Sequence, residues 1–174
     1  MVRGSVGYMA AYLAEHNLSP IAISYLPDKK SLPSDALQSD PYFYMTRRPY
    51  ENEKKEKHNL ISVGGPEAIM DDTNNYTKEH LYPEDAQEQI DHFLHRTYKH
   101  APKEKIDYKF RWHGLMGYTP NGVRLIGPEP INPILLYNLG CNGVGILPSI
   151  YGGQKISWFL EGKQLPPSIF DPRL

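Results

Sequence analysis

A glycine-rich segment between two apolar stretches sets the strongest limit on how this chain folds. The apolar run 134–136 leads to Gly140, Gly143 and Gly145, and a second largely apolar stretch then ends at Gly162. This order predicts a short buried strand, a tight turn and a helix. Glycines let backbone amides come close to a ligand, and the helix directs its positive N-terminal end to the same place. The turn either binds an anionic or electron-rich group or is a tight connection without a ligand.

The composition is that of a globular protein with a sizeable core. The chain has 174 residues, of which 40% are hydrophobic, and a formal net charge of −1. This charge argues against a nucleic acid or a membrane surface as the main partner, because both favour a basic excess. The single cysteine excludes a disulfide framework and indicates a reducing compartment. No apolar run is long enough to span a bilayer, so we expect a cytoplasmic protein.

Several stretches have the composition of β-strands. Residues 42–47 and 60–64 are rich in aromatic and β-branched side chains and predict a hairpin, with the charged run 51–58 as its solvated tip. Residues 21–26 predict another strand, whereas residues 8–13 fit either a helix or a strand. A further strand is predicted by a period-two alternation that leads into a turn at Gly114. Its apolar members, expected on one buried face, are Ile106, Tyr108, Phe110 and Trp112.

A helix is predicted for residues 84–99. It follows Pro83, has acidic residues in its first turn and basic residues at its end, and shows one apolar stripe. Glu88, His92 and His95 share a face of this helix, which is a spacing that metal ligands use. No fourth ligand accompanies them, so we predict solvent-facing histidines and no metal site. Together the elements predict an α+β fold, with a mainly antiparallel sheet covered by this helix.

Two segments resemble the C-terminal signature of the FAD-dependent D-amino-acid oxidase superfamily, which includes glycine, sarcosine and γ-glutamylputrescine oxidases and D-amino-acid dehydrogenases. The family pattern runs Trp-x-Gly, Thr-Pro-Asp/Asn, Ile-Gly, a strand, a Gly-rich turn and a last helix that ends Gly-x-x-Leu-Pro. The matching residues here are Trp112–Gly114, Thr119–Asn121, Ile126–Gly127, the 140–145 turn and Gly162–Pro166. The resemblance is strong from residue 106 to the end and fair over residues 40–65.

The resemblance implies where a cofactor and a substrate would bind. FAD would be non-covalent, because Leu115 stands where some relatives carry the cysteine that attaches it. The implied flavin-binding residues are Gly140, Cys141, Asn142, Gly143, Val144, Gly145 and Ile146. The implied substrate-binding residues are Tyr44, Trp112, Met116, Tyr118 and Arg124. Three have alternatives: cross-strand packing for Tyr44, the end of the core stripe for Trp112, and an exposed strand position for Arg124.

One part of the family pattern has no counterpart in this chain. A nucleotide-binding half begins with a strand, G-x-G-x-x-G and a helix, and no segment here fits that unit. We therefore expect residues 1–130 to correspond to the substrate domain and residues 131–174 to a strand, turn and helix of the FAD-binding domain. The implied function is the C-terminal portion of an oxidoreductase acting on an amine or amino acid, which binds FAD weakly or not at all when alone.

The same interpretation names the partners. A complementary FAD-binding chain would complete the enzyme, and we expect exposed apolar surface on the terminal helix, which also leaves a homo-oligomer open. A rival interpretation is a non-catalytic interaction module or subunit that keeps the substrate-domain fold, because fold alone does not establish activity.

Overall fold

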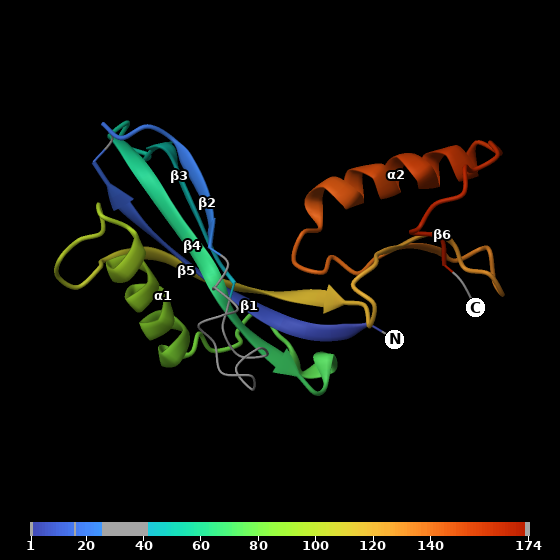
Figure 1. Cartoon of the computed structure of the whole chain (residues 1–174), viewed down its shortest axis with the longest axis horizontal. Helices are drawn as coiled ribbons and strands as arrows, with labels where there is room; N and C mark the ends of the chain where they lie inside the picture. Colours follow the sequence, from blue (N-terminus) through green and yellow to red (C-terminus); the bar gives the residue numbers. More distant parts are fainter. Residues whose placement is uncertain (1, 16, 26–41, 173–174) are drawn as a thin grey trace. The chain divides into compact units, whose positions relative to one another are not determined.

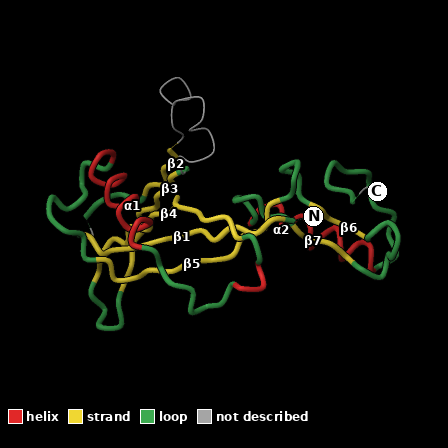
Figure 2. The backbone as a smooth tube through the Cα atoms, turned by 90° about the horizontal axis from the view of Figure 1, so that it is seen from below, coloured by secondary structure: helices red, strands yellow, loops and turns green. Residues whose placement is uncertain are grey.

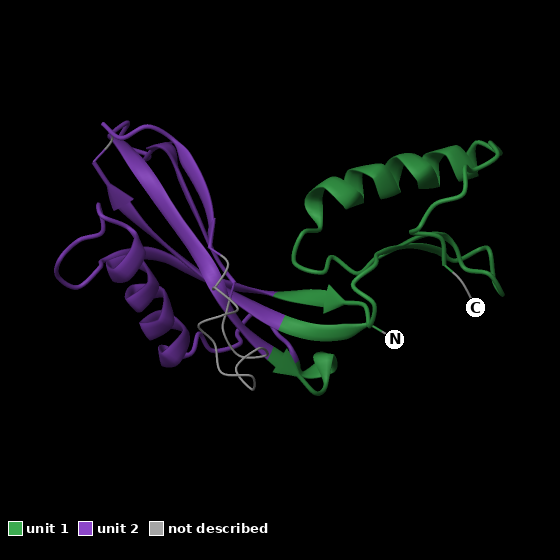
Figure 3. Cartoon of the chain, viewed as in Figure 1, with its two compact units in different colours: residues 1–5, 69–75, 115–174 green, residues 6–68, 76–114 purple. Residues whose placement is uncertain are grey.

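The computed structural model describes residues 2–15, 17–25 and 42–172. The chain forms two compact units, shown in Figure 3. Unit 1 comprises residues 1–5, 69–75 and 115–174, and unit 2 comprises residues 6–68 and 76–114. The division between residues 130 and 131, which the family resemblance implies, remains a prediction.

A five-stranded sheet is the main element, with the strand order β2-β3-β4-β1-β5 (Figures 1 and 2). β3 pairs antiparallel with both β2 and β4. With its helices, this architecture confirms the predicted α+β class. The strands are β1 (Arg3–Ala14), β2 (Ile21–Tyr25), β3 (Phe43–Glu51), β4 (Lys57–Met70) and β5 (Tyr108–Tyr118).

The strands are longer than the sequence predicts. β1 resolves the ambiguity over residues 8–13 in favour of a strand, and β4 continues to Met70. The sequence suggests a surface excursion from residue 66, because Glu67 and the acidic residues after Met70 are polar. In the structure, the residues from Glu67 to Ile69 are exposed but still in the strand. Only the segment after Met70, with a short 3₁₀ turn at Thr73–Asn75, leaves the sheet.

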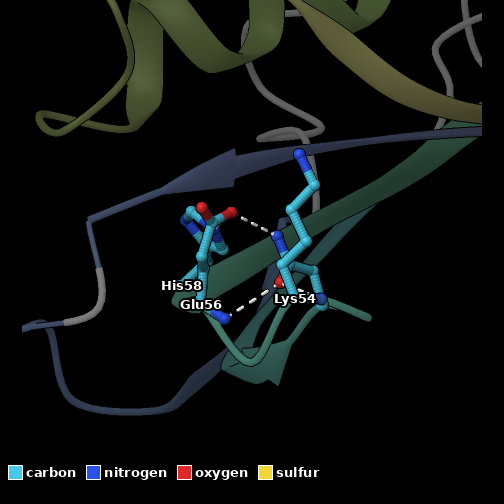
Figure 4. A network of polar contacts seen from close by, with 4 residues as sticks. Lys54, Glu56 and His58 are labelled. Carbon is cyan, nitrogen blue, oxygen red and sulfur yellow. Dashed lines mark hydrogen bonds and ion pairs between the residues drawn. The ribbon is translucent and has the colours of Figure 1, made fainter.

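The β3–β4 turn confirms the solvated hairpin tip (Figure 4). Asn52 organises it: its Oδ1 accepts hydrogen bonds from the backbone amides of Lys54 at 3.0 Å and Glu56 at 2.9 Å, and its Nδ2 donates to Glu56 Oε2 at 2.6 Å. His58 Nε2 lies 4.0 Å from Glu56 Oε2. Such side-chain bonds to the backbone are typical of turns. A shallow hollow of about 400 Å³ beside the tip involves none of the predicted site residues.

Helix α1 (Glu84–Thr97) covers one face of the sheet in unit 2. It starts after Pro83 and ends two residues before the predicted end, with Glu84 and Asp85 in its first turn, where the helix dipole favours acidic groups. Its buried side chains are Ala86, Ile90, Phe93 and Leu94. The rings of Phe93 and Phe43 stack with centroids 4.4 Å apart. This apolar contact is the core of unit 2.

The predicted buried stripe on β5 is wrong beyond Tyr108. Tyr108 is 7% exposed and donates a hydrogen bond to Asp91 of α1 at 2.6 Å, but Phe110 and Trp112 are 42% and 40% exposed. Arg111 Nε donates to Gln87 on α1 at 2.7 Å, so Arg111 rather than Phe110 reaches the helix side. The alternation changes phase between Tyr108 and Phe110, and the strand continues through Gly114 to Tyr118 instead of turning.

Unit 1 contains a second, two-stranded antiparallel sheet. β6 (Leu125–Pro128) pairs with β7 (Leu136–Leu139), and helix α2 (Ile146–Leu160) packs against both. The sequence predicts a strand from residue 134, but Ile134 is 88% exposed and the strand begins at Leu136. The helix starts three residues before the predicted Ser149. It also has partner strands within this chain, contrary to our expectation that these belong to a missing half.

The two faces of α2 differ in chemistry. The buried residues of the helix are Gly152 and Lys155, and Lys155 Nζ donates to Asp171 Oδ1. The outward side carries Ile146, Ile150 and Leu160 at 80%, 67% and 71% exposure, which confirms the expected apolar surface on this helix. Within the described residues no helix is long and apolar enough to cross a bilayer.

Candidate functional site

The glycine-rich turn between β7 and α2 requires backbone conformations that side chains disfavour. Gly140 and Gly143 have φ angles of +78° and +76°, and Asn142 has a φ of 47°. Gly140 is also packed, because an added Cβ would lie 2.6 Å from Thr119 Cγ2. At Gly145, φ is −70°, but an added Cβ would lie 2.8 Å from Cys141 Cβ. At each of these three positions, either the backbone conformation or the close packing therefore explains why the residue is glycine.

Asn142 fixes the turn from one side. Its Oδ1 accepts a hydrogen bond from the amide of Thr119 at 2.8 Å, and its Nδ2 donates to the carbonyls of Gly122 and Gly140 at 3.1 Å each. This ties the glycine-rich turn to the predicted turn at residues 119–122. That turn is confirmed: Gly122 N donates to Thr119 O at 3.1 Å, and Gly122 has a φ of +69°.

Arg124 fixes the turn from the other side. The side chain is 7% exposed, so the prediction of an exposed strand arginine is wrong. Its Nε donates to Asn138 Oδ1 at 3.0 Å, and its Nη2 donates to Asn138 O at 3.2 Å and to Ser149 Oγ at 2.7 Å. Nη1 donates to Gly140 O at 3.4 Å. One guanidinium thus joins the end of β7, the turn and the first turns of α2.

Helix α2 begins at this turn without a capping side chain. Its N-cap is Gly145, and no acidic residue lies in its first turn. The first amides of a helix have no partner within the helix and form the positive end of its dipole. Val144 and Ile146 beside them are 68% and 80% exposed. The turn therefore presents donor groups in an apolar, accessible setting that suits an electron-rich edge of a flat ligand.

Of the predicted flavin-binding residues, some lie inside the turn and some face outward. Gly140 is buried, and Cys141 is half-buried with its Sγ 3.5 Å from Gly117 O. Gly143, Val144 and Ile146 are exposed. The Tyr118 hydroxyl lies 3.2 Å from the position of an added Cβ at Gly143, so Tyr118 adjoins the turn. Unit 1 thus brings together the turn, Tyr118 and Arg124 from the predicted set, and half-buried Met116 precedes Tyr118 on β5.

Two predicted substrate residues, Tyr44 and Trp112, lie in unit 2 on the sheet face that α1 leaves open. On β3, Phe43 and Met45 belong to the α1 core, so Tyr44 between them faces the other way. On β5, Arg111 reaches α1, so Trp112 also faces away. Tyr44 packs across the strands, because an added Cβ at Gly64 would lie 2.5 Å from its Cζ. Burial raises the pKa of Tyr44, with Glu67 and Tyr42 contributing.

Sequence reasoning missed a cluster of rings in unit 2. His113 Nδ1 lies 2.9 Å from the Tyr76 hydroxyl, and His80 Nε2 lies 3.0 Å from the Tyr8 hydroxyl. The rings of His80 and His113 have centroids 5.5 Å apart. The members are 37 and 72 positions apart within the two hydrogen-bonded pairs, so no local pattern reveals them.

The predicted solvent-facing residues of α1 are exposed. Glu88, His92 and His95 all lie at the surface, and His95 Nε2 donates to the carbonyl of Pro102 at 3.0 Å. Elsewhere in the described part of the chain, no three or more histidine, cysteine or acidic side chains gather in a way that could hold a metal ion.

Comparison with known protein families shows the family to which the chain belongs. Residues 7–157 match the family described as FAD dependent oxidoreductase. The chain belongs to this family. A search of curated proteins found no match. Among solved structures the chain is similar to the glycine oxidase from Geobacillus kaustophilus, with a TM-score of 0.58 and 16% identity over 99% of this chain and 39% of that chain. This FAD dependent oxidoreductase chain thus shares the fold of part of that oxidase and spans 39% of its length.

The turn fits the cofactor that the family name implies. FAD ends in a flat ring system with an electron-rich edge, which needs close backbone donors and apolar walls. The positive φ angles of Gly140 and Gly143, the uncapped start of α2 and exposed Val144 and Ile146 supply these features. In this FAD dependent oxidoreductase chain, Gly143, Val144, Gly145 and Ile146 would contact the ring edge, while Asn142 and Arg124 hold the turn in place.

Proposed function

We propose that this chain is the C-terminal, substrate-domain portion of a cytoplasmic FAD dependent oxidoreductase that oxidises a C–N bond of an amine or amino acid. The observation that supports the proposal most directly is the clamped turn. It keeps Gly140 and Gly143 at φ angles of +78° and +76° and opens onto an uncapped helix start. Bound FAD supplies the hydride acceptor for such an oxidation. The residues of this chain would orient the substrate, donate hydrogen bonds to the flavin edge and exclude water from it.

The turn would act on the electron-rich edge of the ring. Amides at the start of α2 donate toward that edge and stabilise negative charge there, and the helix dipole has the same sign. Val144 and Ile146 exclude water beside it. These donors are fixed in advance, because Asn142 and Arg124 hydrogen-bond the turn on both sides. Preorganised donors stabilise charge without reorganising during the reaction.

The open face of the sheet would contact the substrate in unit 2. Trp112 is 40% exposed there, and Phe110, at 42% exposure, has its ring against Tyr50 with centroids 6.3 Å apart. Aromatic side chains provide apolar contact and fix orientation in ligand sites. Tyr44, which is half-buried on the same face, would line it further. We propose that these residues orient the substrate and perform no proton transfer.

Arg124 is assigned to the turn and not to a substrate carboxylate. Its guanidinium already donates to Asn138, Gly140 and Ser149 and is 7% exposed. A buried guanidinium with several fixed acceptors is poorly placed to bind an incoming anion. We therefore expect Arg124→Ala to impair acidic and uncharged amine substrates alike.

The test uses this chain together with the nucleotide-binding half of an FAD dependent oxidoreductase, supplied as a second polypeptide. We expect the pair to bind FAD and the chain alone to be colourless. Amines and amino acids are added without oxygen, and the bleaching of the flavin absorbance is followed. Gly143→Val and Gly145→Val should abolish bleaching, because a branched side chain strains the first position and fills the space beside Cys141 at the second.

Gly162→Val is the matched control. Gly162 has a φ of +71°, close to that of Gly143, but an added Cβ meets nothing within 4 Å, and the residue follows the far end of α2. The control therefore reproduces the backbone strain without touching the turn. Normal bleaching in the Gly143→Val and Gly145→Val proteins would remove the reason for placing the flavin at this turn. A stoichiometric yellow preparation of the chain alone would show that it does not need the other half.

A further inference from the structure

Four rings of unit 2, here called the ring cluster, form two hydrogen-bonded pairs that also contact each other. The hydroxyl oxygen of Tyr8 lies 3.0 Å from His80 Nε2. The hydroxyl oxygen of Tyr76 lies 2.9 Å from His113 Nδ1. Across the pairs, the ring centroids of Tyr8 and His113 are 6.3 Å apart, and those of Tyr76 and His80 are 6.0 Å apart. The ring cluster therefore gathers two nitrogen and two oxygen donors in one place.

The ring cluster joins three separate parts of unit 2. Tyr8 is on β1, His113 is on β5, and Tyr76 and His80 lie in the segment between β4 and α1. Tyr8 is 3% exposed, and the other three side chains are half-buried. The donors are thus partly withdrawn from water, which strengthens their interaction with a charged ligand, and they remain within reach of a small ion from solvent.

The spacings in the ring cluster match those between the ligands of one metal ion. With bonds of about 2.0 Å, two neighbouring ligand atoms lie roughly 2.8 Å apart at a right angle and roughly 3.3 Å apart at a tetrahedral angle. The two nitrogen-to-oxygen distances, 3.0 and 2.9 Å, fall in this range. Two imidazoles on one tetrahedral ion have ring centroids roughly 5 Å apart. Those of His80 and His113 are 5.5 Å apart, so an ion would require little movement of these rings.

The surroundings of the ring cluster favour a cation. Burial raises the pKa of Tyr8, and the carboxylate of Asp85 and the hydroxyl of Tyr76 add to this effect. The carboxylate that opposes a phenolate at Tyr8 also attracts a positive ion to the same place. Tyr82 packs edge-on against Tyr8, with ring centroids 5.5 Å apart, and provides an apolar wall beside the donors.

The donor set indicates the kind of ion. Imidazole nitrogens and phenol oxygens are of the nitrogen and oxygen type that Cu²⁺ and Ni²⁺ accept in tetragonal sites, and Cu²⁺ binds most tightly among the divalent first-row ions. Ca²⁺ and Mg²⁺ prefer oxygen ligands throughout. Because two of its four donors are phenols, the ring cluster differs from the groups of three histidine, cysteine or acidic side chains, which are absent from the described part of the chain.

We propose that the ring cluster is a binding site for Cu²⁺, with two imidazole nitrogens and two phenol oxygens as ligands. These are Nε2 of His80, Nδ1 of His113 and the hydroxyl oxygens of Tyr8 and Tyr76. The ion would replace the proton that each pair now shares, and each phenol that binds as a phenolate releases its proton to solvent. The site involves no residue of the glycine-rich turn, so Cu²⁺ binding is independent of flavin binding.

The test is titration of the full chain with Cu²⁺ after treatment with a chelator. Equilibrium dialysis should show one tightly bound Cu²⁺ per chain, with hyperfine splitting from two imidazole nitrogens in the electron paramagnetic resonance spectrum and a phenolate-to-copper band in the visible spectrum. His80→Ala and His113→Ala should each lower the affinity at least tenfold. Tyr8→Phe and Tyr76→Phe keep the ring and remove the oxygen, so each should weaken the visible band while the far-UV circular dichroism spectrum stays unchanged.

The double variant His92→Ala and His95→Ala is the matched control, because both histidines are exposed on α1 outside the ring cluster. It should leave the affinity and both spectra unchanged. Equal affinity of all variants, or a chain that binds no Cu²⁺, would overturn the proposal. So would a loss of binding in the control when His80→Ala and His113→Ala still bind. Two imidazole ligands without a phenolate band would overturn the assignment of the tyrosines.

A bound ion would also tie the segment before α1 to β1 and β5. Amide hydrogen exchange at residues 76–82 should therefore become slower when Cu²⁺ binds, and the exchange should remain unchanged in His113→Ala. An exchange rate that Cu²⁺ does not alter in the unmodified chain would contradict ligands from all three parts of unit 2.

Discussion

The two helices of this protein bury opposite kinds of side chain. In unit 2, α1 buries Ala86, Ile90, Phe93 and Leu94 against the sheet and leaves its polar side to solvent. In unit 1, α2 buries Gly152 and Lys155 against its hairpin and leaves isoleucines outside. The contact under α1 is mainly apolar, whereas the contact under α2 includes hydrogen bonds from Arg124, Asn138 and Lys155.

Unit 2 therefore buries the apolar side of its helix within the chain, whereas unit 1 leaves apolar surface of its helix exposed. Apolar burial is the main source of folding free energy, at about 25 cal/mol per Å² of apolar surface. Unit 2 gains this free energy from contacts within the chain. Unit 1 holds its helix in part by specific polar contacts, which contribute only about 1 kcal/mol each and mainly fix geometry. The comparison predicts that unit 2 is stable alone, whereas unit 1 gains stability when the exposed apolar side of α2 is covered.

The chain offers a separate reporter for each unit, because its two tryptophans, Trp112 and Trp158, lie in unit 2 and unit 1 respectively. Fluorescence during urea unfolding of Trp158→Phe follows unit 2, and that of Trp112→Phe follows unit 1. We expect a lower midpoint for unit 1. Equal midpoints would show that the polar contact under α2 stabilises as well as the apolar contact under α1.

The largest effect is expected at the centre of the α1 contact. Phe93→Ala removes a ring that is 5% exposed and stacked on Phe43, so unit 2 should lose about 4 kcal/mol of unfolding free energy. The loss is measured by urea unfolding with the Trp112 reporter. Ile150→Ala removes an apolar side chain that is 67% exposed on α2, and the Trp158 reporter should show almost no change. A comparable loss at Ile150 would contradict the contrast between the helices.

The buried charge under α2 should give the next largest effect. Asp171→Asn leaves the ammonium of Lys155, which is 1% exposed, without its counter-ion. Unit 1 should lose about 3 kcal/mol, at the low end for a broken buried pair because the Asp171 side chain is 36% exposed. Urea unfolding with the Trp158 reporter measures it. Restoring stability with the double change Lys155→Met and Asp171→Asn would show that the unpaired charge causes the loss.

Two adjacent glycines distinguish the inner and outer sides of α2. An added Cβ at Gly152 would lie 2.3 Å from Asn138 Oδ1, so Gly152→Ala should destabilise unit 1 by about 2 kcal/mol. At Gly153 the space is open, and Gly153→Ala should stabilise the helix by up to about 1 kcal/mol through helix propensity. Amide hydrogen exchange across residues 146–160 measures both. The same sign at both positions would mean that α2 does not rest on its hairpin in this register.

The smallest effect concerns pH and applies to unit 2. Burial raises the pKa of Tyr82 to about 12, offset in part by Arg111, and burial also raises the pKa values of Tyr8 and Tyr108. Because the folded pKa lies above the unfolded value of about 10, this stability is present below about pH 10 and is lost as pH rises towards 12. The Tyr82 hydroxyl is buried without a hydrogen-bond partner among the described residues. Tyr82→Phe should therefore fold normally and weaken the loss of stability between pH 10 and 12, followed with the Trp112 reporter. An unchanged pH profile would mean that Tyr82 does not contribute.

Elements with local signals were predictable from the sequence, and those that depend on distant partners were not. α1 has prolines on both sides, a helical apolar stripe and complementary terminal charges, and its predicted start at residue 84 is confirmed. On β5, alternation in the sequence does not reveal the change of phase after Tyr108, because the change depends on which residue meets Gln87 and Asp91 of α1. Periodicity assigns a side chain to a face only where the strand remains regular.

The candidate site shows the same limit. The glycine pattern identified the turn, since glycine at φ angles of +78° and +76° leaves a direct trace in the sequence. The role of Arg124 leaves no such trace in the sequence. Its acceptors lie on residues 138, 140 and 149, which are up to 25 positions later in the chain. An arginine in a strand is usually exposed, and only the folded hairpin and helix together show that this one is buried.

The ion pair under α2 also sets the order in which unit 1 is completed during synthesis. Asp171 follows Lys155 by 16 positions, so the helix leaves the ribosome before the carboxylate that neutralises its buried ammonium. Phe170 O, which accepts a hydrogen bond from Ile126 N at 2.8 Å on β6, emerges at the same late stage. The hairpin and helix therefore cannot reach their final packing until the residues around 170 are translated. A nascent chain stalled before them would leave the ammonium of Lys155 without its carboxylate and Ile126 N without its acceptor.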